Sequence, residues 1–154
     1  MSLSFKFDTG PMLQQLAAVR TARDEDIRFA LAQVAVQMLT WMNTGSPNEP
    51  LKPPIRFGTL RGSGSAFVGD KLIGVAPSEG GEPTPATSLS APDYTITVVY
   101  NTDYAAKMHE WKGGWGPYTT QDGNAGAKWI EKHINADGPL AMAGFAEILR
   151  ERAK

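Results

Sequence analysis

The chain has 154 residues, a formal net charge of -1 and no cysteine. This length suits one domain with a core of ordinary size. The near-zero charge gives no global attraction to nucleic acid or anionic lipid, and the lack of cysteine excludes a disulfide framework and a thiol nucleophile. The N-terminal segment lacks the pattern of a secretory signal, and no window is apolar enough to span a bilayer, so we expect a soluble protein without a membrane partner.

The N-terminal third predicts two helices. Residues 11–20 have the spacing of a short amphipathic helix. A longer helix is expected to begin at a cap on Thr21 or Asp24, with acidic residues in its first turn, and to end at Gly45 and Pro47. Its apolar residues recur at steps of three and four and form the clearest amphipathic stripe in the chain: Ile27, Leu31, Val34, Met38 and Trp41.

The middle of the chain predicts a small sheet. Residues 46–56 contain four prolines and are expected to form an extended loop, followed at 57–64 by a turn or a single helical turn. A glycine in the first position of Gly69-Asp70 is typical of a tight type II′ hairpin turn. Three strands are predicted, the first two joined by this turn: residues 65–68, 71–75 and 93–101.

The remaining segments complete an α+β domain. Residues 77–92 and 112–125 are predicted to be mobile loops, of a length often associated with function or with ordering on assembly. Further helices are expected at 104–111, 127–135 and 140–152, the last two separated near Gly138-Pro139. The order of elements indicates one domain over 1–154, with a small antiparallel sheet packed against the long N-terminal amphipathic helix and the C-terminal helices. The open edges of such a sheet often pair with a neighbouring chain.

The pair His109-Glu110 is the first candidate for catalysis. A zinc hydrolase needs a second histidine four residues after the first, and that position is Gly113. His133 would have to supply the missing ligand from elsewhere in the fold. A small metal-dependent hydrolase using His109, Glu110 and His133 is therefore kept as an alternative, and polar contacts at a helix end are the simpler interpretation. No other catalytic, cofactor-binding or metal residue is predicted, and we expect a protein that is not an enzyme and needs no cofactor.

Aromatic side chains among glycines predict either a packed loop or a contact surface. Trp111, Trp115 and Tyr118 lie in such a segment. Arg61 is a basic residue that follows a proline-rich loop, where it is either solvated, paired with an acid or able to touch phosphate. An adaptor that binds a peptide with residues 111–118 is a further interpretation.

Three short signatures follow one another between residues 57 and 131. They read FGTLRGSG at 57–64, YAAKMHE at 104–110 and GAKWIE at 126–131. In this order they resemble the T-G-x-L-R-x-S element, the Y-A-x-x-x-H-E element and the G-x-K-[FYW]-[LI]-E helix start of the minor capsid, or tail-completion, proteins of long-tailed bacteriophages. Phe57 departs from the pattern, because the family usually has threonine or another polar residue there.

The resemblance implies a structural virion protein of the neck that joins head and tail and forms a ring, with six as the expected number of copies. The implied partners are other copies of the chain, head-completion or connector proteins, and tail-tube or tail-terminator proteins, with DNA at most passing through the ring. The protein would be made in the bacterial cytoplasm and located at the head–tail junction. The candidate subunit-contact residues are then Arg61, His109, Glu110, Trp111, Trp115 and Tyr118.

Overall fold

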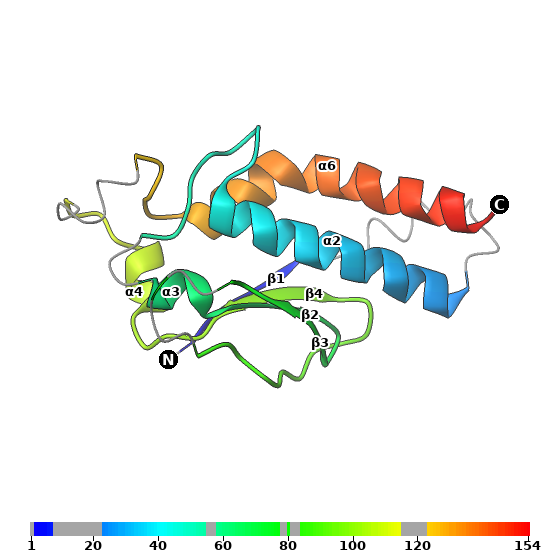
Figure 1. Cartoon of the computed structure of the whole chain (residues 1–154), viewed down its shortest axis with the longest axis horizontal. Coiled ribbons are helices and arrows are strands. Elements are labelled where there is room, and N and C mark those ends of the chain that lie inside the picture. The colour runs from blue at the N-terminus through cyan, green and yellow to red at the C-terminus, as the bar shows by residue number, and fades with distance from the viewer. Residues whose placement is uncertain (1, 8–22, 55–57, 78–79, 81–83, 115–122) are drawn as a thin grey trace.

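The fold is α+β, as predicted: a four-stranded antiparallel sheet carries two long helices, α2 and α6, on one face (Figure 1). The computed structural model describes residues 2–7, 23–54, 58–77, 80, 84–114 and 123–154. The helix expected at 11–20 lies outside this range. The elements are β1 (Leu3–Phe7), α2 (Asp24–Thr44), α3 (Thr59–Gly62), β2 (Gly64–Val68), β3 (Lys71–Val75), β4 (Ile96–Tyr100), α4 (Ala105–His109) and α6 (Trp129–Arg152).

The strands lie in the order β1-β4-β2-β3, and every neighbouring pair is antiparallel. The hairpin of β2 and β3 was predicted, and Gly69 has the positive φ of +58° that the first position of its turn requires. β4 is shorter than the predicted strand and occupies the middle of the sheet. β1 was not predicted, although Leu3, Phe5 and Phe7 alternate with polar residues; it forms one edge, where Phe5 lies opposite Val98.

The central strands β2 and β4 are buried on both faces of the sheet. Ala66, Val98 and Tyr100 point toward the helices and belong to the main core. Phe67 and Thr97 point the other way and are also fully buried. Residues 84–95, the described stretch before β4, return beneath the sheet, on the side away from the helices (Figure 1).

Helix α2 has the predicted core stripe, since Leu31, Val34 and Met38 are all buried. Its end also matches the prediction, because the chain leaves the helix at Gly45 with φ +83°. The predicted cap was wrong for Asp24, which is already the first helical residue. The N-cap is Arg23, whose side chain makes no capping hydrogen bond.

The predicted break at Gly138-Pro139 was wrong. Helix α6 continues through both residues as one element of 24 residues. Pro139 removes only the hydrogen bond to the carbonyl of Asn135, four residues earlier. Packing along α2 and the buried hydrogen bonds of Asp137 hold the helix together on either side of this gap. Tertiary contacts thus override the local preference.

Candidate functional site

The three sequence signatures, which are far apart in the chain, meet at one end of the sheet (Figure 1). Helix α3 lies beside α4, and α6 begins next to them. The backbone N–H of Asn101 donates to the carbonyl of Ser63 at 3.4 Å, and the N–H of Lys128 donates to the carbonyl of His109 at 2.8 Å. We call this region the signature end. Its side chains are the best candidates for a functional site because the sequence analysis singled them out independently.

A buried hydrogen-bond chain fixes the first signature. The hydroxyl of Tyr100 donates to Asn43 Oδ1 at 2.6 Å, and Asn43 Nδ2 donates to the carbonyl of Arg61 at 3.1 Å. Arg61 Nε in turn donates to the carbonyl of Pro53 at 2.9 Å. Burial raises the pKa of the Tyr100 hydroxyl, which therefore keeps its proton and acts as a donor. Arg61 is only 5% exposed, so its side chain ties the proline-rich loop to α3.

An aromatic cluster joins the second and third signatures. The ring of His109 lies 4.9 Å from the ring of Phe5 and 4.9 Å from that of Trp129, and Trp129 meets Tyr100 edge-on at 5.6 Å. All of these rings except Phe5 are fully buried. Among the residues that the structure describes, His109 Nε2 and Trp129 Nε1 have no hydrogen-bond partner. Burial lowers the pKa of His109, because the charged imidazolium would lose its hydration.

A small exposed ion-pair group lies above this cluster. Lys128 Nζ lies 2.6 Å from Glu110 Oε2 and 3.2 Å from Glu131 Oε2. The hydrogen bond from Lys128 and the contact with His109 lower the pKa of Glu110, and Glu110 raises the pKa of Lys128. Lys128 also has a positive φ of +62°, which is uncommon for a residue with a side chain. Because the group is exposed to water, its ion pairs add little stability.

His133 takes part in a separate network, built around the fully buried pair of His133 and Asp137. Its Nδ1 lies 2.6 Å from Asp137 Oδ2, and its Nε2 donates to the carbonyl of Leu51 at 2.7 Å. Ser46 donates to Asp137 Oδ1 at 2.7 Å. Both ring nitrogens are therefore engaged, and neither faces the serine hydroxyl, so the set lacks the order of a Ser-His-Asp triad. The network attaches the loop after α2 to the middle of α6.

The metal-site hypothesis requires His109, Glu110 and His133 to lie close together. Among the residues that the structure describes, no three histidine, aspartate or glutamate side chains gather into a group that could hold a metal ion. His109 contacts the aromatic cluster, whereas His133 is bonded to Asp137 and Leu51. The residues grouped by that hypothesis thus belong to two different local networks.

The signature end exposes two large aromatic side chains. Tyr104 is 42% exposed and Trp111 is 36% exposed. Trp111 Nε1 donates to the carbonyl of Gly114 at 3.2 Å, and Lys107 Nζ lies 5.7 Å from the centre of a Trp111 ring. A Cβ at Gly113 would lie 2.6 Å from the indole, so only glycine allows this packing. Sequence reasoning missed Tyr104, although its place at the start of the second signature was a usable signal.

The six predicted subunit-contact residues thus have different environments. Those that are buried can influence a contact only through the residues that they position. Arg61 and His109 are buried, whereas Glu110 and Trp111 are exposed. Trp115 and Tyr118 lie outside the described residues.

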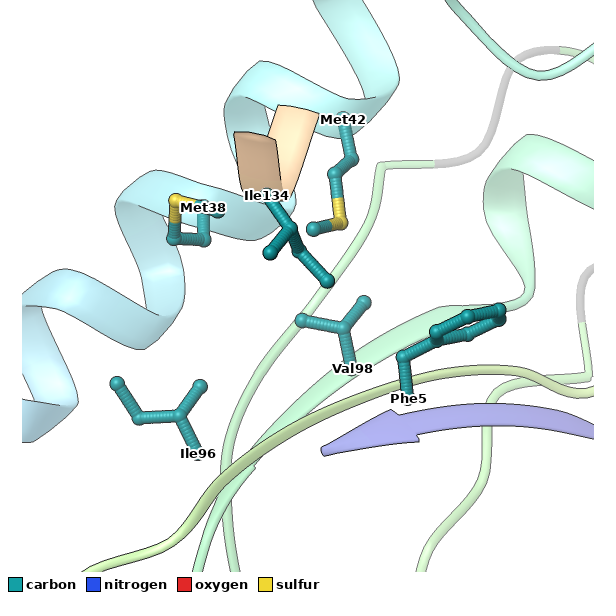
Figure 2. Close-up of a pocket in the computed structure, with 6 residues that line it drawn as sticks. All are labelled: Phe5, Met38, Met42, Ile96, Val98 and Ile134. Carbon is teal, nitrogen blue, oxygen red and sulfur yellow. The ribbon is translucent and has the colours of Figure 1, made fainter. Parts of the chain in front are cut away.

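Two of the hollows in the described part of the molecule bear on the search for a binding site. The first, in Figure 2, is a void of about 10 Å³ between α2, α6 and the sheet, with an apolar lining. It is too small for a ligand and barely large enough for one water molecule, which would find no hydrogen-bond partner there. The second is a shallow groove of about 410 Å³ on the outer side of α2 and α6. The void is lined by Phe5, Met38, Met42, Ile96, Val98 and Ile134.

Comparisons with known proteins do not assign the chain to a family. No family model, no curated protein sequence and no solved structure matches it. Within the described residues, none of the helices combines the length and the apolar character needed to cross a bilayer.

Proposed function

We propose that this chain is a structural subunit of the neck of a long-tailed bacteriophage, in the minor capsid or tail-completion class. In this role it joins head and tail as part of a ring of identical copies, for which six is the expected number. The proposal rests first on the ordered resemblance of the three signatures to that class.

The strongest structural support for the proposal is the packing of the three signatures at one end of the fold. Residues 58–64, 104–110 and 126–131 are separated by long connections in the sequence, but they lie together in space. A chance set of short motifs has no reason to converge in this way. Their packing supports the view that the three motifs have one common role, which is to form a defined surface at this end of the domain.

The chemistry of the signature end supports binding more than catalysis. His109 is buried between aromatic rings, and its Nδ1 faces Glu110 at 3.1 Å. Glu110 is itself occupied by Lys128. A general base needs a substrate within hydrogen-bond reach, and the burial of His109 leaves no room for one. The exposed groups are Tyr104 and Trp111, whose large amphipathic rings are typical of protein contact surfaces.

The direct test is the assembly state of the purified chain. Native mass spectrometry and negative-stain electron microscopy should show rings, either of the chain alone or after addition of the tail-tube and connector proteins of the same phage. A strict monomer that binds neither protein would argue against the proposal. Portal and head-completion genes before this gene, with a tail-tube gene after it, would support it independently.

The contact surface can be tested with a matched pair of variants. Tyr104→Ala combined with Trp111→Ala should weaken ring formation or partner binding at least about tenfold, because buried aromatic anchors contribute most to interfaces. Glu25→Ala, exposed in the first turn of α2 at the end of that helix away from the signature end, serves as the control and should leave assembly unchanged. Circular dichroism should confirm that all variants fold. Equal assembly by the double variant and the control would exclude the signature end as the contact.

A further inference from the structure

The underside of the sheet is buried at its centre, although both long helices lie on the other face (Figure 1). Ser65 and Phe67 of β2 point to the underside and are fully buried. Their partners on β4, Val99 and Thr97, are buried as well. On the edge strand β1, by contrast, Ser4 faces the same way, opposite Val99, and is exposed. The cover is therefore local to the central strands.

This cover is the stretch of residues 84–95, which returns beneath the sheet and which we call the strap (Figure 1). At one end of β4, Asn101 Nδ2 donates to the carbonyl of Thr84 at 2.9 Å. At the other end, the backbone N–H of Gly69 donates to the carbonyl of Thr95 at 2.9 Å. The strap therefore runs under the length of β4 and lies below the buried side chains of the underside.

The middle of the strap has few attachments to the sheet. Within the described part of the chain, none of the residues from Pro85 to Ala91 makes a hydrogen bond with the sheet. The half-buried side chains of this stretch are apolar but mostly small: Pro85, Ala86, Leu89 and Ala91. A segment with few buried apolar contacts and no hydrogen bonds of its own opens at a lower free energy than the core.

Two buried hydroxyls beneath the strap favour its opening. Ser65 Oγ and Thr97 Oγ1 have no hydrogen-bond partner among the described residues. A buried polar atom without a partner raises the free energy of the form in which it is buried. Water can reach both hydroxyls when the strap lifts, and the main core on the helix side of the sheet stays intact.

A charged clasp joins the C-terminal end of the strap to α2. Arg28 Nε lies 2.8 Å from Asp24 Oδ2, and Arg28 Nη2 lies 3.3 Å from Asp93 Oδ2. The guanidinium also lies 5.1 Å from the centre of the Tyr94 ring, and the Tyr94 hydroxyl donates to Asp24. Tyr94 has a φ of +61°, a left-handed conformation that is unfavourable for a residue with a side chain. Release of the clasp would relax this strain.

We propose that the strap is a cover that opens and closes over the underside of the sheet while the sheet and both long helices stay folded. The clasp around Arg28 sets how often it opens. Opening exposes two apolar side chains and two hydroxyls at the centre of the sheet, so the strap controls access to a face that is hidden in the closed form. This device is independent of the proposed phage role.

The absence of cysteine allows the opening to be measured by thiol labelling. Thr97→Cys places a thiol beneath the strap, and Val98→Cys, its neighbour on β4, places one in the main core on the helix side. A disulfide reagent that releases a coloured thiolate should label Thr97→Cys at least about tenfold faster than Val98→Cys in the absence of denaturant. The rate for Thr97→Cys should also change little at low urea concentrations, because a local opening exposes little surface. Equal rates, or rates with the same dependence on urea, would overturn the proposal.

The clasp is tested by adding Arg28→Ala to both cysteine variants. The ratio of the Thr97→Cys rate to the Val98→Cys rate should rise several-fold, because the strap then opens more often. Arg150→Ala is the matched control, since it removes an exposed arginine that pairs with Glu147 on α6, and it should leave the ratio unchanged. An equal ratio with Arg28→Ala and Arg150→Ala would overturn the role of the clasp.

A second thiol position keeps the test valid if circular dichroism shows that Thr97→Cys does not fold. Ser65→Cys exchanges the other unpaired hydroxyl beneath the strap for a thiol and should give the same labelling pattern. Labelling of Ser65→Cys no faster than that of Val98→Cys would overturn the proposal.

Discussion

Single buried polar atoms fix the geometry of the signature end. Tyr100, Asn43 and Arg61 come from β4, α2 and α3, and one line of hydrogen bonds connects them. Each donor and acceptor in this line has lost its water, so each depends on its protein partner. The loss of one of these atoms is therefore expected to weaken the packing of all three elements.

Tyr100→Phe tests this dependence. The variant leaves the buried Asn43 Oδ1 without its donor, and the expected loss in the free energy of unfolding is about 1–3 kcal/mol. Urea denaturation measures the loss. Tyr104→Phe is the matched control, because water can replace the hydroxyl of this half-exposed residue; its change should stay within about 0.5 kcal/mol. Equal losses in the two variants would mean that the buried hydrogen bond contributes no more to the free energy of unfolding than the exposed hydroxyl does.

His109 predicts a pH dependence of stability. Burial lowers its pKa in the folded protein below the ordinary value of 6.5. Between the pKa of the folded protein and 6.5, the unfolded chain binds the proton more readily than the folded protein does. The free energy of unfolding is therefore highest above pH 6.5 and decreases as the pH drops toward the folded pKa. The neighbouring Glu110 also has a lowered pKa, but its contribution disappears only below its ordinary value of 4.5.

Urea midpoints measured between pH 7.5 and 5 should therefore decrease in the wild type. His109→Gln should have a smaller slope over this range, whatever its absolute stability. His109 also lowers the pKa of Glu110, but Glu110 titrates below its ordinary value of 4.5 and therefore outside this range, so the difference in slope between the two proteins reports His109. Parallel curves would show that the proton on His109 has no influence on folding.

At the scale of elements, the parts that were predicted are those whose pattern is local. The core stripe of α2 and the turn at Gly69 depend on spacing within a few residues, and both were found. β1 was missed because a five-residue strand is defined by its partner, and β4 lies nearly a hundred residues away. The candidate site was recognised only as separate motifs. Neither the burial of Arg61 nor the contact of His109 with Trp129 could be inferred without the fold.

Helix α6 gives a further prediction at this scale, because it keeps a proline in its interior. Pro139 prevents one backbone hydrogen bond, which a residue with an N–H would restore. Pro139→Ala should therefore raise the free energy of unfolding, by up to about 3 kcal/mol, as measured by urea denaturation. Ala143→Pro, one turn further along the same exposed side, should lower stability by a similar or larger amount. A loss of stability in Pro139→Ala would mean that Asp137 and its partners need the local geometry that proline imposes.

At the scale of the whole molecule, one core connects both helices to the sheet. Leu31 from α2, Phe145 from α6, Ala66 from β2 and Val98 from β4 belong to the same buried cluster. The end of α6 is also attached to the start of α2, where Arg152 Nε lies 2.5 Å from Asp26 Oδ1. An element that left this arrangement would expose the apolar surface of the others, so none has a core of its own.

This shared core predicts that the described elements unfold together. Far-ultraviolet circular dichroism reports the helices, and tryptophan fluorescence reports the environments of the four tryptophans, of which the fully buried Trp129 at the signature end should change most on unfolding. The two signals should give the same urea midpoint, as expected for a single domain of this size. Leu31→Ala, which removes a fully buried side chain near the opposite end of α2, should lower both midpoints equally, with a loss of about 2–5 kcal/mol. If the urea midpoint from fluorescence stayed unchanged while the midpoint from circular dichroism fell, the signature end would be an independent folding unit. The packing of the three signatures would then not depend on the rest of the sheet and helices.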